Sequence, residues 1–170
     1  DGPSQMAVSD VGYIRTLTHV NNGRSEIACH LFHPSDAVSA YRLCELMANI
    51  DGMCYLRTHR PDARFLYAFD ETFPVRGCKQ LREGGDLTLV GSGFVLHNVL
   101  AAAEELARNK ISCNVFDAYT LPLDADPILK AAHRSKCMIL CVEDNYAGGV
   151  GSEIAGAAAA QGDTRVVSMT

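Results

Sequence analysis

The feature that most constrains the fold is a regular alternation of short apolar runs with helix-like segments in the second half of the chain. The expected strands are residues 87–90, 112–116, 138–142 and 165–168, and the expected helices are residues 95–110, 126–133 and 152–160. Strands that alternate with helices in this way favour a mostly parallel sheet covered on both faces. The crossovers between such strands are right-handed. The sequence therefore predicts an α/β fold.

The first part of the chain offers fewer regular elements. Residues 3–15 predict a short helix, and residues 29–32 and 53–56 predict strands, the second of them buried. Asp36 is the expected N-cap of a helix that ends near Asp51. Two strands with their helices cannot easily bury both faces of a parallel sheet. We therefore expect the segment before Pro61 to be poorly protected in the isolated chain.

The sequence pattern predicts a connection between two domains in residues 61–85. This segment has few periodic apolar residues and contains Pro74, Gly77 and Gly84-Gly85. We place the boundary so that residues 1–75 form one domain and residues 76–170 the other.

Composition excludes several classes of protein. Apolar residues make up 48% of the 170 residues and charged residues 21%, which is typical of a globular chain. The net charge of −5 argues against a nucleic-acid surface, and no apolar run reaches the roughly 20 residues that a membrane helix needs. The seven cysteines are odd in number, form no CxxC pair and mostly lie in apolar runs, so we interpret them as reduced core thiols of a cytosolic protein.

Two glycine-rich turns are candidate anion sites. Gly91-Ser92-Gly93 lies between a strand and a helix, and Asp117 after the next strand suits a ribose contact in a nicotinamide-binding module. Leu96 occupies the third glycine position of that fingerprint, which weakens the hypothesis. The second turn, residues 148–151, opens a helix, but Glu153 already complements the helix dipole, so a packing turn is favoured.

Polar residues also follow two expected strands. Arg57 and Arg60 flank Thr58-His59 after residues 53–56, and the carboxyl ends of parallel strands are where α/β sheets bind ligands. Arginine offers a rigid donor fork for phosphate, although a solvated basic turn is the alternative. Residues 143–144, Glu-Asp, are either catalytic carboxylates or a polar strand end.

Three segments together resemble the transketolase family. They are Asp1-Gly2-Pro3-Ser4-Gln5-Met6-Ala7, Leu56-Arg57-Thr58-His59-Arg60-Pro61 and Val142-Glu143-Asp144-Asn145-Tyr146-Ala147-Gly148-Gly149-Val150-Gly151. The resemblance implies that residues 1–75 are the second half of a thiamine pyrimidine-binding domain and residues 76–170 a three-layer C-terminal domain. It implies transfer of a two-carbon ketol unit from a ketose phosphate to an aldose phosphate. The family uses thiamine diphosphate with Mg²⁺ or Ca²⁺ and works as a homodimer in the pentose phosphate pathway.

The resemblance also suggests roles for individual residues. Asp1 matches an aspartate that binds a hydroxyl of the donor sugar, and Gln5 matches a residue near the cofactor that is glutamine in animal-like members. Arg60 matches the arginine that binds the sugar phosphate. His59 replaces a residue that is commonly serine, which adds a hydrogen-bond donor or alters the preference among sugars. The segment from His33 to Asp36 resembles a turn with a structural role.

The family's cofactor-activating glutamate and its glycine-aspartate-glycine and asparagine metal motif have no counterpart in these residues. We therefore expect no catalytic residue or metal ligand of the family here, and no transketolase activity without the missing N-terminal region or subunit. A piece of a transketolase, a nicotinamide-binding module and a noncatalytic assembly domain remain as three hypotheses.

Overall fold

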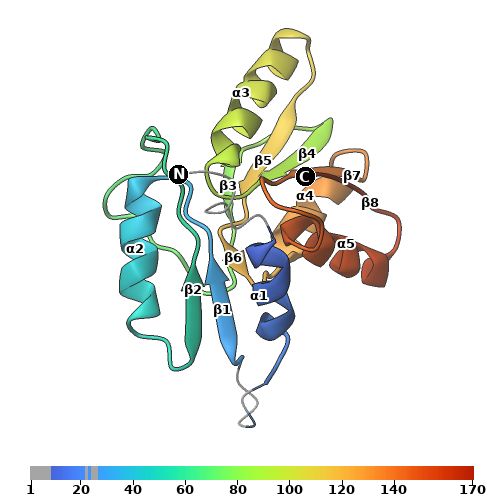
Figure 1. Ribbon diagram of the computed structural model, residues 1–170. Helices are drawn as coiled ribbons and strands as arrows, with labels where there is room; N and C mark the ends of the chain where they lie inside the picture. The colour runs from blue at the N-terminus through green and yellow to red at the C-terminus, as the bar shows by residue number, and fades with distance from the viewer. Residues whose placement is uncertain (1–8, 22, 24–26) are drawn as a thin grey trace.

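The computed structural model describes residues 9–21, 23 and 27–170, which form two β-sheets flanked by helices (Figure 1). The first sheet has the strand order β2-β1-β6 and the second has the order β3-β5-β4-β7-β8. The strands are β1 (Cys29–Phe32), β2 (Met53–Leu56), β3 (Lys79–Arg82), β4 (Leu87–Gly91), β5 (Cys113–Asp117), β6 (Thr120–Leu121), β7 (Met138–Val142) and β8 (Arg165–Met169). The helices are α1 (Asp10–Thr18), α2 (Ala37–Met47), α3 (Val95–Arg108), α4 (Asp126–His133) and α5 (Val150–Gln161).

The second sheet has the three-layer form that the sequence predicts. Strands β5, β4, β7 and β8 are parallel to one another, and β3 pairs antiparallel with β5 at the edge of the sheet. Successive residues of each strand point to opposite faces. Leu89 packs in one apolar cluster with α3, whereas Val90 packs in another with α4 and α5. The mostly parallel α/β fold is thereby confirmed.

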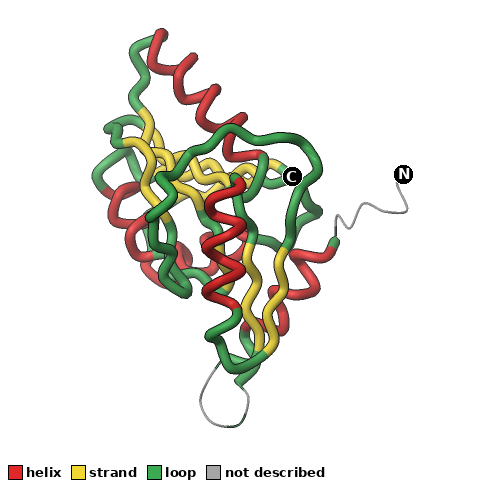
Figure 2. Tube along the Cα trace, turned by 90° about the vertical axis from the view of Figure 1, so that its left-hand side faces the viewer, coloured by secondary structure: helices red, strands yellow, loops and turns green. Residues whose placement is uncertain are grey.

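The first sheet lies between two helices. Phe32 of β1 packs against Val38 and Leu43 of α2, and Leu31 shares a cluster with Val11 of α1. Figure 2 shows α2 running alongside the strands β1 and β2, and Figure 1 shows α1 on the opposite side of these strands. Helix α2 begins where the sequence predicts, because the Asp36 carboxylate accepts a hydrogen bond from the Ser39 amide at 2.7 Å.

The structure corrects the predicted bounds in several places. Strand β2 is only partly buried, because it is an edge strand and Met53 is 48% exposed. Strand β3 lies inside the expected connection of residues 61–85, where pairing with β5 creates it. Helix α1 runs to Thr18 rather than to residue 15, and residues 3–8 of the expected helix lie outside the described residues.

Strand β6 also was not predicted. It pairs antiparallel with β1, so the first sheet gains a third strand from the second half of the chain. Leu121 of β6 and Leu31 of β1 belong to the same apolar cluster as the residues of α4 and α5. The two sheets therefore share one core, and the domain boundary at residue 75 stays a prediction.

In the described part of the chain, no helix combines the length and the apolar character required to cross a membrane. All seven cysteines are free thiols, although Cys44 is exposed rather than part of the core.

Candidate functional site

Polar side chains meet beyond the carboxyl ends of two pairs of parallel strands. His33 follows β1, residues 57–60 follow β2, Ser92 follows β4 and Asp144 follows β7. The strands belong to two different sheets, so the site lies at the junction between them. Residues that are far apart in the chain thus come together at the carboxyl ends of strands, as expected for α/β sheets.

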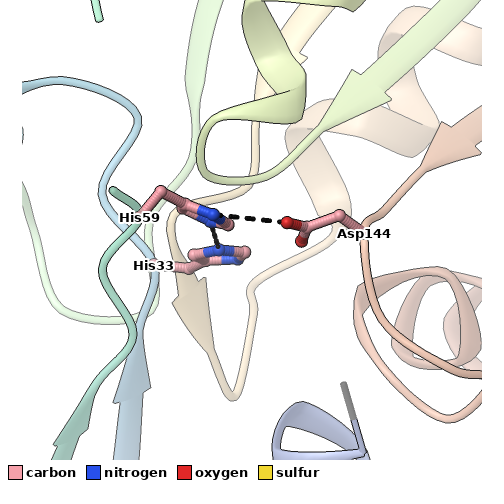
Figure 3. Close-up of side chains that lie close together, drawn as sticks. All are labelled: His33, His59 and Asp144. Atoms are coloured by element: carbon pink, nitrogen blue, oxygen red, sulfur yellow. Dashed lines mark hydrogen bonds and ion pairs between the residues drawn. The ribbon is translucent and has the colours of Figure 1, made fainter. Parts of the chain in front are cut away.

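At the centre are two adjacent histidines and a carboxylate (Figure 3). The Nε2 atoms of His33 and His59 are 2.5 Å apart, and the ring centroids are 4.8 Å apart. His59 Nδ1 lies 3.3 Å from Asp144 Oδ2. His33 is buried, whereas the His59 side chain keeps 16% of its surface exposed.

Hydrogen bonds behind His33 fix the orientation of its ring. Ser92 Oγ donates its proton to the Ala118 carbonyl at 3.0 Å and lies 2.9 Å from His33 Nδ1. Because a hydroxyl has one proton, His33 Nδ1 carries the hydrogen and donates it to Ser92. His33 Nε2 is therefore an acceptor that faces His59.

Arg57 connects this cluster to α1. Its Nη1 donates to Asp144 Oδ1 at 2.6 Å and lies 3.1 Å from His33 Nε2, and its Nε donates to Asp10 Oδ2 at 3.2 Å. The Tyr55 hydroxyl donates to the same Asp10 oxygen at 2.7 Å. Since two carboxylates engage this guanidinium, the structure does not support Arg57 as a phosphate ligand.

Burial sets the charge state of both imidazoles. Desolvation, together with the neighbouring Arg57 and His59, holds the pKa of His33 well below its ordinary value. Desolvation also lowers the pKa of His59, although Asp144 acts in the opposite direction. Both rings are accordingly neutral near pH 7 and retain a lone pair each.

A cavity of about 460 Å³ opens beside His59. Thr58, His59 and Arg60 line one wall, and Asp36 and Asp62 also contribute. The Asp36 carboxylate is already bonded to the backbone N–H groups of residues 39, 66 and 67. His59 and Arg60 are thus the side chains of this wall that are suited to binding an anion.

The nucleotide hypothesis fails at the first glycine-rich turn. Asp117 is fully buried and accepts from Ser35 Oγ and from the Tyr67 hydroxyl, each at 2.7 Å, so it cannot bind a ribose. Gly93 has a φ of +64°, and a Cβ there would lie 2.2 Å from His33 Nε2. The imidazole therefore occupies the space that a phosphate would need.

The second glycine-rich turn holds a carboxylate of the protein itself. Glu143 accepts from the amides of Val150 and Gly151 at 2.7 and 2.8 Å, at the N-terminus of α5. The packing interpretation is confirmed, but the charge that complements this helix is Glu143. Glu153 instead pairs with Arg15 at 3.1 Å.

The predicted site residues have different outcomes. Asp1 and Gln5 lie outside the described residues. His59 and Arg60 line the same cavity, and their proposed roles stay predictions. His33 was interpreted as structural, yet it lies at the centre of the cluster. The signal that could have found it is its position directly after a strand of the parallel pair β1 and β2.

Comparison with known proteins identifies the family. The family described as "Transketolase, C-terminal domain" matches residues 77–170. The chain belongs to the transketolase family. It is 40% identical to transketolase of Mus musculus over 161 residues, which cover 92% of the chain and 24% of that protein. It is 39% identical to transketolase-like protein 1 of Bos taurus over 167 residues, covering 96% of the chain and 26% of that protein.

Solved transketolase structures agree with the fold. A split-gene transketolase, described as an inactive β4 tetramer, superposes with a TM-score of 0.86 at 25% identity, covering 97% of this chain and 52% of that one. Transketolase from Campylobacter jejuni gives a TM-score of 0.63 at 16% identity, covering 100% of this chain and 24% of that one, and supports the fold alone. The chain spans about a quarter of the length of the curated transketolases that it matches.

Proposed function

We propose that this chain is part of a transketolase that transfers a two-carbon ketol unit from a ketose phosphate to an aldose phosphate, with thiamine diphosphate and Mg²⁺ or Ca²⁺ as cofactors of the complete enzyme. The observation that carries the proposal is the position of the Arg-Thr-His-Arg segment at the carboxyl end of β2, where Arg60 and His59 line a cavity. Membership of the transketolase family supports it.

In this proposal Arg60 binds the phosphate of the sugar. An arginine guanidinium presents paired donors to phosphate oxygens. His59 adjoins it in the cavity and supplies a further ring nitrogen. Asp1 is proposed to bind a hydroxyl of the donor sugar and Gln5 to lie near the cofactor.

The described residues do not fit a thiamine diphosphate site. Glu143 fills the glycine-rich turn before α5, and His33 fills the space beside Gly93, so neither turn accepts a diphosphate. We therefore assign the cofactor to other parts of the enzyme, contributed by an N-terminal transketolase region or subunit. A homodimeric, cytoplasmic complete enzyme is part of the same proposal.

Complementation tests this function. The purified chain is mixed with the N-terminal region of an animal transketolase, thiamine diphosphate and Mg²⁺, and ketol transfer is measured with a phosphorylated and an unphosphorylated donor. Transfer is expected in the mixture only. Turnover by the chain alone, or no turnover in a mixture shown to form a complex, would contradict the proposal.

The variant Arg60→Ala tests the phosphate contact. Loss of a charge-assisted contact of roughly 1.5–3 kcal/mol should lower kcat/KM for the phosphorylated donor by about one to two orders of magnitude, with little effect on the unphosphorylated donor. Arg64→Ala is the matched control, since Arg64 is exposed and lies outside the residues that line this cavity. An equal loss with both donors would count against Arg60 as the phosphate ligand.

A noncatalytic assembly domain is the second candidate. The solved split-gene neighbour is described as an inactive tetramer, so a related chain exists as an assembly without activity. A complex that forms with the N-terminal region yet gives no ketol transfer would favour this candidate.

A further inference from the structure

We propose that His33, His59 and Asp144 form a binding site for one divalent transition-metal ion, with Zn²⁺ as the first candidate. One ligand atom from each residue lies within 4.8 Å of the others (Figure 3). Two imidazoles and one carboxylate are a donor set that Zn²⁺ takes in three-ligand sites. The proposal does not depend on the proposed function, because metal binding is measured without sugar or thiamine diphosphate.

The hydrogen bonds around His33 prepare it as a ligand. Since His33 Nδ1 donates to Ser92, its Nε2 lone pair points toward His59. A metal-bound histidine commonly donates its other N–H to a neighbouring acceptor, which fixes the ring and its tautomer. Ser92 has that role here, and the Ala118 carbonyl fixes Ser92 in turn.

His33 donates from Nδ1 to Ser92. If His59 likewise donates from Nδ1 to Asp144, neither Nε2 atom carries a proton. Nε2 of each ring would then face the other as an acceptor at 2.5 Å. A cation between the two nitrogens relieves this repulsion.

Metal binding requires the rings to move apart. Zn–N bonds of about 2.0–2.1 Å in tetrahedral geometry put the two nitrogens roughly 3.3 Å apart, which is wider than the 2.5 Å observed. His33 is buried and anchored by Ser92, whereas His59 lies in the segment after β2 and is partly exposed. We therefore expect His59 to make most of the movement.

Arg57 is the group that competes with the metal. Its Nη1 contacts both Asp144 and His33, which are two of the three ligands. Its Nε is bonded to Asp10 Oδ2, and Asp10 Oδ1 is buried without a hydrogen-bond partner in the described part of the chain. A guanidinium displaced by the metal can turn toward Asp10 Oδ1 and keep a carboxylate partner.

The donor set also indicates which ions the site favours. Mg²⁺ and Ca²⁺ prefer oxygen ligands, whereas imidazole suits Zn²⁺, Co²⁺ and Ni²⁺. Three protein ligands leave the fourth position of Zn²⁺ open, and His59 lies on the wall of the adjacent cavity.

Calorimetric titration of the full chain with zinc chloride tests the site. One Zn²⁺ per chain is expected, and His59→Ser and Asp144→Asn should each lower the affinity by about 100-fold or more, because loss of a ligand exceeds the 10- to 100-fold effect of an outer-shell partner. Arg57→Gln should tighten binding by about tenfold, since it removes the competing cation. His133→Ala is the matched control, because His133 pairs with Asp163 away from the cluster.

Cobalt spectroscopy excludes binding by the free thiols. Co²⁺ in the site should give visible bands without a thiolate charge-transfer band in the near ultraviolet, because the ligands are nitrogen and oxygen. Absence of one-to-one binding, an affinity unchanged by His59→Ser and Asp144→Asn, weaker binding by Arg57→Gln or a thiolate band would each overturn the proposal. His59 is partly exposed, so His59→Ser tests the site even where a His33 variant fails to fold.

Discussion

A buried carboxylate at the end of β5 makes the stability of this fold depend on pH. Asp117 is fully buried, and its Oδ2 accepts from Ser35 and Tyr67, whereas its Oδ1 has no hydrogen-bond partner among the described residues. Desolvation raises the pKa of Asp117 from 3.8 to about 7, although the bonds from Tyr67 and Ser35 act in the opposite direction. The folded protein therefore holds a proton on Asp117 that the unfolded chain releases at lower pH.

The sign and size of the effect follow from this difference in pKa. Because the folded-state pKa is raised, the stabilisation from protonated Asp117 is complete below pH 3.8 and is lost as the pH rises through about 7. At 1.36 kcal/mol per pKa unit, the interval from 3.8 to about 7 corresponds to a loss of the order of 4 kcal/mol, of which roughly 3 kcal/mol falls between pH 5 and pH 8.

The variant Asp117→Asn removes the titration and keeps an oxygen acceptor for Ser35 and Tyr67. Urea unfolding of both proteins at pH 5 and pH 8 gives the free energies of unfolding. The stability of the variant relative to the wild type should increase by about 3 kcal/mol from pH 5 to pH 8. Asp51→Asn, at an exposed carboxylate, is the control and should show no such change. An Asp117→Asn difference that is equal at both pH values would refute the argument.

Two further predictions concern how the elements are held. Glu143→Ala leaves the amides of Val150 and Gly151 at the start of α5 without their acceptor, and should lower the free energy of unfolding by about 3 kcal/mol in urea denaturation; a loss below about 1 kcal/mol would contradict the cap. Amides of β1 should exchange with solvent as slowly as those of β4 in mass-spectrometric hydrogen exchange, because β1 is paired on both edges, to β2 and β6. Fast exchange confined to the segment before Pro61, as the sequence alone predicts, would count against this contribution of β6.

Elements defined by their own apolar pattern were predictable. The bounds of β1, β2, β7 and α4 agree with the sequence analysis, since each has a local run of apolar residues with a clear limit. Helix α5 begins at Val150, two residues before the predicted start, because the Glu143 carboxylate holds its first amides. Strands β3 and β6 exist through pairing with partners distant in sequence, and short-range periodicity has no information about such a register.

The candidate site was predictable only in part. The rule that ligands bind at the carboxyl ends of strands selects His59 and Arg60, which follow β2, and Asp144, which follows β7. The sequence analysis did not select His33, which contacts His59 across 26 positions of the sequence, and it did not predict that Arg57 would contact Asp144 across 87 positions. No spacing rule relates residues at the ends of strands in two separate sheets.

His59 belongs to both proposed sites, and this limits what each can do at one time. Its Nε2 lies 2.5 Å from His33 and its Nδ1 lies 3.3 Å from Asp144, so both ring nitrogens are engaged in the cluster. An imidazole has only two nitrogens, and an anion in the adjoining cavity can gain a hydrogen bond from His59 only at the expense of one of these contacts. A metal ion would engage one nitrogen permanently and leave Arg60 to hold the anion. If both proposals hold, metal binding by the cluster decides whether the cavity offers a phosphate donors from both His59 and Arg60 or from Arg60 alone.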